Sequence, residues 1–182
     1  MNRTRLLYSA LLMTLPLAVQ AEGDQKYVYQ AGHPSLKEWL LPDTPPYPEG
    51  NELTPERVAL GHKLFFDPRL SGEGNMACAT CHNPSLGWSD GLPTAKGFKS
   101  MQLGRASPTI VNTAHNSIQM WDGRKKSLED QAMGPMEATV EMNMDTMRLF
   151  KWLNNSKGYR ALFEKAYPGQ GINADTLSKA LA

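Results

Sequence analysis

The chain has 182 residues, and its 19 Lys and Arg nearly balance its 18 Asp and Glu, giving a formal net charge of +1. A balanced charge gives no support for nucleic-acid binding, which is typical of strongly basic domains. The length suffices for one compact domain with its own hydrophobic core, and the sequence contains no internal repeat or low-complexity tract.

The chain opens with a predicted secretory signal peptide that ends at Ala21. Arg3 and Arg5 precede an apolar run from residue 6 to 19, and small residues flank the cleavage site. The run has about fourteen residues and contains Pro16, whereas a membrane-spanning helix needs roughly twenty. Cleavage removes two of the 19 basic residues and no acidic one, which leaves 17 against 18. We therefore expect a periplasmic chain without a membrane span, with an uncleaved anchor as the alternative.

Helices dominate the rest of the predicted structure, and no segment has the convincing alternating pattern of a strand. The predicted helices begin after capping residues, and the first carries proline at its first position and ends before Asp67-Pro68. The last helix has a start signal at Asn173 but no stop signal, which is typical of a helix that is cut off. The predicted helices cover residues 55–66, 128–132, 146–154, 157–167 and 174–182.

Two long loops join these helices, at residues 42–53 and 83–116. Loops of that length are uncommon in a small domain unless something besides a protein core organises them. A large planar cofactor would supply the missing core.

Both cysteines lie in the segment ACATCHNP, where Cys78 and Cys81 are followed directly by His82. Cys-x-x-Cys-His is the attachment signature of c-type haem, in which two thiols form thioethers with the porphyrin and the histidine ligates the iron. A thioredoxin-like pair would need a βαβ setting, and a zinc site would need further ligands at a suitable spacing. A structural disulfide fits an exported protein but leaves His82 unexplained. The sequence therefore favours one covalent haem c.

Four segments resemble, in order, the N-terminal domain of the bacterial di-haem cytochrome c peroxidase family, which includes the MauG-like enzymes. They are LGHKLFFDPRLSGEGNMACATCHNPSLGWSDGLP, LGRASPTIVN, MWDGRKKSLEDQAMGP and VEMN. The resemblance implies an all-α, cytochrome c-like domain whose long loops wrap around one covalent haem. We expect a signal peptide at 1–21, an N-terminal extension at 22–53 and this domain at 54–182, truncated before the second haem domain that the family carries.

The resemblance also implies roles for individual residues. His82 corresponds to the proximal iron ligand and Trp121 to the tryptophan between the two haems. Gln131 and Glu141 correspond to the polar pair on the peroxide side. Such a pair suits the chemistry, because a carboxylate can relay a proton between the peroxide oxygens and an amide can orient the peroxide. Without the family pattern, Trp121 would read as a core residue and the polar pair as surface residues.

Two positions depart from the family pattern. Phe98 stands sixteen residues beyond the proximal histidine, where the reductively activated peroxidases carry a removable histidine ligand. A phenyl ring has no lone pair for iron, so we expect an open ferric site, with His115, Met101 and Lys99 as the alternative ligands. Ala106 replaces an asparagine of the family's interdomain calcium site, which leaves calcium binding doubtful.

The remaining histidines and methionines have simpler interpretations. We expect His62 to be exposed on its helix and His115 to be packed or to lie on the propionate side of the haem. Methionines fill gaps around irregular cores, and this is the role expected of Met101, Met136, Met142 and Met144.

Two function classes stay open. A peroxidase-like oxidoreductase would reduce hydrogen peroxide with electrons from a small periplasmic donor protein, or would oxidise a partner protein in the MauG-like manner. A mono-haem c-type electron carrier would have no catalysis of its own and a six-coordinate iron. The resemblance favours the enzyme, although we expect the fragment alone to turn over poorly. The oligomeric state, including a homodimer, stays open.

Overall fold

The computed structural model describes residues 32–182, which fall into two units, residues 32–42 and 43–182. In the first unit, a short 3-10 helix spans Pro34–Trp39, and the ring Nδ1 of His33 accepts a hydrogen bond from the Ser35 N–H at 3.2 Å. The predicted signal peptide lies outside the described residues. No helix within residues 32–182 is long and apolar enough to cross a membrane.

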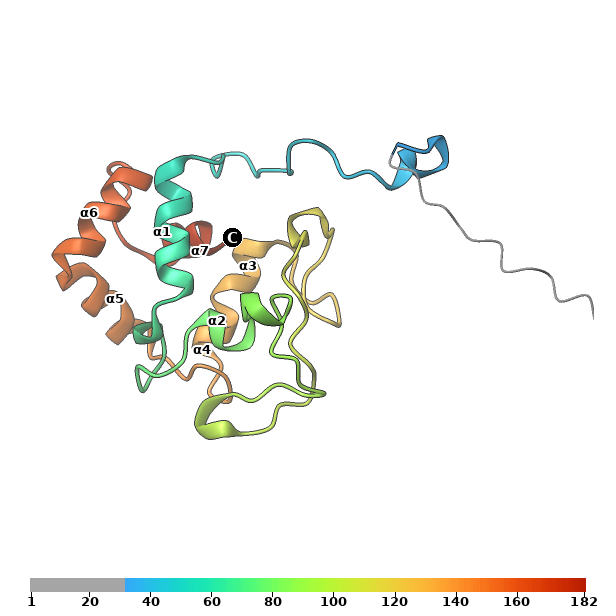
Figure 1. Cartoon of the computed structure of the whole chain (residues 1–182). Coiled ribbons are helices and arrows are strands. Elements are labelled where there is room, and N and C mark those ends of the chain that lie inside the picture. Colours follow the sequence, from blue (N-terminus) through green and yellow to red (C-terminus); the bar gives the residue numbers. More distant parts are fainter. Residues whose placement is uncertain (1–31) are drawn as a thin grey trace, which may run out of the picture. The chain divides into compact units, whose positions relative to one another are not determined.

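The second unit is helical, as the all-α prediction requires (Figure 1). Its α-helices are α1 (Pro55–Phe65), α2 (Cys78–Cys81), α3 (Leu128–Ala132), α4 (Gly134–Glu137), α5 (Thr146–Asn155), α6 (Lys157–Ala166) and α7 (Ala174–Leu181). Short 3-10 turns are η2 (Pro68–Leu70), η3 (Pro84–Leu86), η4 (Phe98–Ser100) and η5 (Thr113–His115). The described part of the chain contains no strand, and its β-type pairing is limited to three isolated bridges.

Local capping explains where the longer helices begin. The Thr54 hydroxyl accepts a hydrogen bond from the Arg57 N–H at the start of α1, and the Ser127 hydroxyl accepts one from the Asp130 N–H at the start of α3. Asp145, Ser156 and Asn173 cap α5, α6 and α7 in the same way. All five predicted helices are therefore confirmed. The sequence missed α2 and α4, because four-residue helices carry no readable hydrophobic period.

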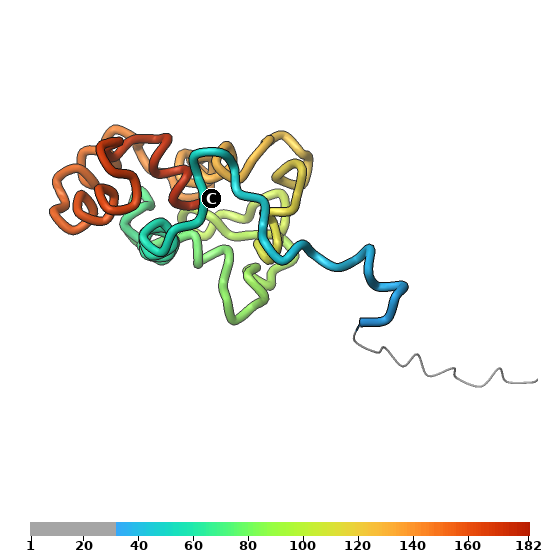
Figure 2. Tube along the Cα trace, turned by 90° about the horizontal axis from the view of Figure 1, so that it is seen from above, coloured from blue at the N-terminus to red at the C-terminus, as the bar shows by residue number. Residues whose placement is uncertain are grey.

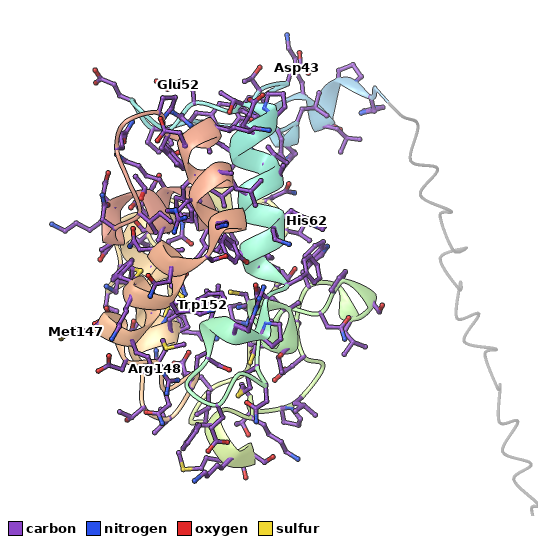
Figure 3. All side chains as sticks on the ribbon, turned by 90° about the vertical axis from the view of Figure 1, so that its left-hand side faces the viewer. Asp43, Glu52, His62, Met147, Arg148 and Trp152 are labelled. Atoms are coloured by element: carbon purple, nitrogen blue, oxygen red, sulfur yellow. The ribbon has the colours of Figure 1, made fainter. Side chains whose placement is uncertain are left out.

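The hydrophobic core lies where α1, α5, α6 and α7 meet. In Figures 1 and 2, α5 and α6 lie on one side of α1, whereas α2, α3 and α4 lie on the other. α7 packs against both α1 and α3 and so connects the two groups. Fully buried leucines fill this core, namely Leu60, Leu64, Leu149, Leu153 and Leu177. Exposed residues lie outside it, such as Met147, which is 82% exposed and labelled in Figure 3.

The segment between α2 and α3 forms a lobe of loops. Its regular structure consists of η3, η4 and η5, and its three isolated bridges pair Asn83 with Ser89, Lys96 with Gln102 and Gln119 with Lys125. The prediction of a long loop at 83–116 is therefore confirmed, apart from these turns. The lobe lies beside α2 in Figure 1 and supplies part of the wall of a cavity.

Candidate functional site

A cavity of about 420 Å³ lies among the end of α1, α2, the 110–115 segment and the α3–α4 pair. A second cavity of about 560 Å³ adjoins it, since both are lined by Phe65, Ile110, Ala114 and Leu128. Sites for small molecules and cofactors usually have volumes of this order. The first cavity brings together five of the predicted site residues, which are Cys78, Cys81, His82, Gln131 and Glu141.

The helix α2 presents both cysteines to this cavity. Its first turn is fixed by the Thr80 hydroxyl, which accepts a hydrogen bond from the Ala77 N–H at 2.9 Å. The two cysteines form no disulfide with each other, which disfavours the structural-disulfide interpretation. Burial raises the pKa of the Cys78 thiol to about 11 and also raises that of Cys81. A thioredoxin-like pair needs a βαβ setting, and residues 32–182 contain no strand, so the structure disfavours that interpretation.

His82 is oriented by carbonyl oxygens of the loop lobe. Its Nδ1 lies 3.1 Å from the Pro108 carbonyl oxygen and 3.3 Å from that of Trp88. Because carbonyl oxygens only accept, Nδ1 carries the ring proton, and Nε2 keeps the lone pair that a metal ligand needs. Two cysteines without a disulfide and a histidine of this tautomer on one cavity wall fit a covalently attached haem. Within residues 32–182, no three His, Cys, Asp or Glu side chains converge on a metal-ion site.

The polar pair also lines this cavity. Gln131 lies on α3, and its amide Nε2 is 3.7 Å from the Met120 sulfur. Glu141 lies between α4 and α5 and is partly buried. Burial raises the pKa of Glu141, and the opposing charges of Arg124 and His82 only reduce that rise. The cavity therefore combines thiols, an imidazole, an amide and a carboxyl group whose pKa is displaced toward neutrality.

Trp121 does not belong to this cavity. Its side chain is 64% exposed, and its indole N–H donates to the Ala106 carbonyl oxygen at 2.8 Å. The neighbouring Asp122 forms ion pairs with Arg105 at 2.8 Å and with Arg124 at 2.7 Å. The structure thus places Trp121 on the surface of the loop lobe, where its indole is anchored to the segment that contains Ala106.

Only some of the other candidate iron ligands line the cavity. His115 and the buried Met136 and Met142 line it, whereas Phe98, Lys99 and Met101 do not. Lys99 instead pairs with Glu73 at 3.6 Å. Met136, Met142 and Met144 join the core as predicted, but the expectation for Met101 is wrong, because that side chain is 42% exposed at the end of a tight turn. His62 is exposed on α1, as predicted (Figure 3).

Sequence reasoning missed Phe65 as part of the wall. Its ring centroid lies 6.5 Å from that of His82 and 5.9 Å from that of Trp88. The sequence signal that could have indicated it is the Phe65-Phe66 pair at the end of α1. The Phe65 ring turns toward the loop that follows Cys81. Pro108 was also missed, because it acts through its backbone carbonyl.

Comparisons with known proteins identify the family of this chain. The sequence model described as "Di-haem cytochrome c peroxidase" matches residues 55–182. The methylamine utilization protein MauG of Methylorubrum extorquens is 49% identical over 142 residues, which are 78% of this chain and 40% of that protein. Cytochrome c551 peroxidase of Pseudomonas aeruginosa is 38% identical over 134 residues, or 72% of this chain and 39% of that protein.

A solved structure of a MauG-like protein has a similar fold. The crystal structure of a MauG-like protein associated with microbial copper homeostasis aligns with a TM-score of 0.71 and 27% identity, covering 79% of this chain and 44% of that one. The chain spans less than half the length of these relatives. Because the family model covers residues 55–182, most of the chain, the chain belongs to the di-haem cytochrome c peroxidase family.

Proposed function

We propose that this chain provides the peroxide-reacting haem domain of a periplasmic oxidoreductase. One observation carries the proposal: a single cavity is lined by the haem-attachment residues Cys78, Cys81 and His82 and by the polar side chains of Gln131 and Glu141. An electron carrier needs the first set only. A peroxidase needs both, because cleavage of the oxygen–oxygen bond requires proton movement.

The residues around the cavity have distinct tasks in this proposal. Cys78 and Cys81 would hold one haem c through thioethers, and His82 would ligate its iron through Nε2. When bound, the haem supplies the redox chemistry. Reduction of hydrogen peroxide to two waters consumes two electrons and two protons, so the protein must also handle protons. The chain's own contribution to turnover is therefore the orientation of peroxide and the transfer of a proton.

Glu141 would transfer that proton. Its position on the cavity wall allows contact with a small ligand, and burial raises its pKa, so the carboxylate accepts a proton more readily near neutral pH than an exposed glutamate does. The Gln131 amide would fix the orientation of peroxide. The exposed Trp121 would carry electrons toward the cavity from a second haem domain or a partner.

The electrons would come from a small periplasmic donor protein, or from a protein substrate that is oxidised in the MauG-like manner. A periplasmic donor requires that the chain is exported, and the predicted signal peptide that ends at Ala21 supports export. The single Cys-x-x-Cys-His motif supports one haem in these 182 residues.

Replacement Glu141→Gln tests the proposal. In the haem-loaded protein with a reducing dye as electron donor, we expect peroxide turnover to fall by a factor of about 10² to 10⁴, the usual loss when general acid–base catalysis is removed. Haem content should stay normal. Glu137→Gln is the matched control, because Glu137 is exposed on α4 and does not line the cavity. Equal turnover in the two variants would contradict the role of Glu141, and a six-coordinate ferric iron that does not react with peroxide in the unmodified protein would favour the electron carrier.

A further inference from the structure

The segment that carries Glu141, residues 138–144, has no regular secondary structure to fix it. It joins α4 to α5 through a tight turn in which the N–H groups of Glu141 and Asn143 both donate to the Ala138 carbonyl oxygen, each at 3.0 Å. Asn143 adopts a left-handed backbone conformation, with φ of 48°. The Met142 and Met144 N–H groups tie the end of this segment to α4, since they donate to the Pro135 and Met136 carbonyl oxygens at 3.1 and 2.8 Å. The place of the turn around Glu141 itself depends in addition on contacts from outside.

One external contact comes from the loop lobe, at Gly97. The Phe98 N–H donates to the Val140 carbonyl oxygen at 2.9 Å. A β-carbon at Gly97 would overlap that oxygen and would lie 3.1 Å from the Glu141 α-carbon. Backbone atoms cannot move aside as the end of a flexible side chain can. Gly97 has φ of −104°, so its backbone conformation does not demand glycine. The close approach to residues 140 and 141 does.

The loop at Gly97 is itself rigidly closed. The Gly97 N–H donates to the Met101 carbonyl oxygen at 2.9 Å, and the Gly97 carbonyl oxygen accepts from the Ser100 N–H at 2.9 Å. Lys99 and Ser100 both have positive φ, 52° and 60°. A turn closed in both directions transmits a displacement at residue 97 to its neighbour at residue 140 instead of absorbing it.

A second contact holds the other end of the Glu141 segment. The Gly72 N–H donates to the Met142 carbonyl oxygen at 2.8 Å, and a β-carbon at Gly72 would overlap the Asn143 carbonyl oxygen. The Arg148 guanidinium donates to the Gly72 carbonyl oxygen. Glu141 thus lies between two points where a glycine backbone meets the segment directly, one residue before it and one or two residues after it.

We propose that Gly97 and Gly72 are positioning residues that fix Glu141 for its reaction with the bound peroxide, by clamping the 138–144 backbone from both sides. This inference rests on the proposed function, because it gives Glu141 a catalytic task. The clamp acts on the backbone, so it needs no side-chain contact with the carboxyl group itself. It also makes the loop at 97–101 part of the peroxide-handling machinery, although Phe98 itself does not line the cavity.

The test is Gly97→Ala in the haem-loaded protein, alone and combined with Glu141→Gln. A misplacement of about 1 Å can cost a factor of about 10², so we expect kcat for peroxide to fall about 10- to 100-fold with little change in KM. In the Glu141→Gln background the same change should alter kcat by less than about twofold, because the group that it misplaces is already lost. Gly104→Ala is the matched control, since that glycine lies in the same loop with no atom within 4 Å of an added β-carbon.

Hydrogen exchange gives a readout that does not depend on turnover. Mass spectrometry of the haem-loaded Gly97→Ala protein should show exchange in residues 138–144 at least about 10-fold faster than in Gly104→Ala. If Gly97→Ala yields no folded haem protein, Phe98→Pro and Phe98→Ala decide the matter. Both remove the ring, but only proline removes the N–H that bonds Val140, so only Phe98→Pro should lower kcat and accelerate exchange in this segment.

The outcomes separate the inference from the proposed function. If Glu141→Gln leaves turnover unchanged, the role of Glu141 is wrong. If Glu141→Gln lowers turnover but Gly97→Ala lowers it by the same factor in both backgrounds, Gly97 acts on the fold and not through Glu141, and the clamp is refuted. Unchanged exchange at residues 138–144 would refute it as well.

Discussion

Removal of one hydroxyl group, in Tyr159→Phe, tests how the end of α1 that borders the cavity is joined to the helical core. Tyr159 lies on α6 and is 1% exposed, and its hydroxyl donates to a carboxylate oxygen of Asp67 at 2.5 Å. Asp67 follows α1, the helix whose end carries Phe65 to the cavity wall. The Arg69 guanidinium and N–H also donate to this carboxylate, at 2.5 to 3.2 Å.

The expected cost is about 2 kcal/mol of unfolding free energy, the usual net value of a buried hydrogen bond to a charged group. The carboxylate keeps Arg69 as a partner, so it is not left unpaired. Burial alone raises the pKa of Asp67, but the hydrogen bonds from Arg69 and Tyr159 outweigh it and lower the pKa from 3.8 to about 2. The stabilisation is therefore present above about pH 4 and is lost as the pH falls through about 2.

Urea unfolding of both proteins at pH 7 and near pH 2 measures this difference. Tyr167→Phe is the control, because Tyr167 is also fully buried but its hydroxyl donates to the neutral Asn51 amide oxygen at 3.1 Å. That bond should contribute only about 1 kcal/mol, independent of pH in this range. The reasoning fails if Tyr159→Phe costs no more than Tyr167→Phe, or if its cost is the same at both pH values.

Two further predictions concern the cofactor and the segment before α1. Produced in a host that attaches haem, the protein should retain its haem through denaturing electrophoresis, as seen by haem staining. It should lose the haem when Cys78 and Cys81 are both replaced by serine. Release of haem from the unmodified protein would contradict thioether attachment. Asn51→Ala should lower the unfolding free energy by about 2 kcal/mol, because it leaves the buried Tyr167 hydroxyl without its acceptor. Asn154→Ala, at an exposed site on α5, should cost less than about 1 kcal/mol, and equal costs would count against the Asn51 contact.

Features encoded by adjacent residues could be predicted from the sequence. The five longer helices were predicted because each begins with a capping side chain that accepts a hydrogen bond from the N–H three residues later. Ser127, which accepts from the Asp130 N–H, is an example. The shared position of Cys78, Cys81 and His82 on one cavity wall could be predicted because the three residues form a continuous motif; their attachment to haem stays a prediction. Local rules decide these features, so no knowledge of the fold was needed.

Features that depend on distant segments could not be predicted. The carbonyl of Pro108 that orients His82 is 26 residues away, and the Gly97 approach to Val140 spans 43 residues within irregular backbone. Neither contact involves a side chain with a recognisable pattern. The surface position of Trp121 could not be read either, since a tryptophan in isolation indicates burial, and only the packing of the loop lobe places it outside.

The structure also reduces the number of side chains that could serve as a sixth ligand to a haem iron held by His82. Of the three alternative ligands, Lys99 and Met101 lie outside the cavity, and Lys99 is paired with Glu73, whereas His115 lines the cavity. Phe98 is held at its N–H and has no lone pair for iron. With His115 expected to be packed or on the propionate side of the haem, the ferric protein should give a high-spin electron paramagnetic resonance signal and react with peroxide without prior reduction. A low-spin signal that became high-spin in His115→Gln would identify His115 as a sixth ligand and refute the open site. A Phe98→His protein that stayed high-spin would show that the loop at 97–101 does not reach the iron.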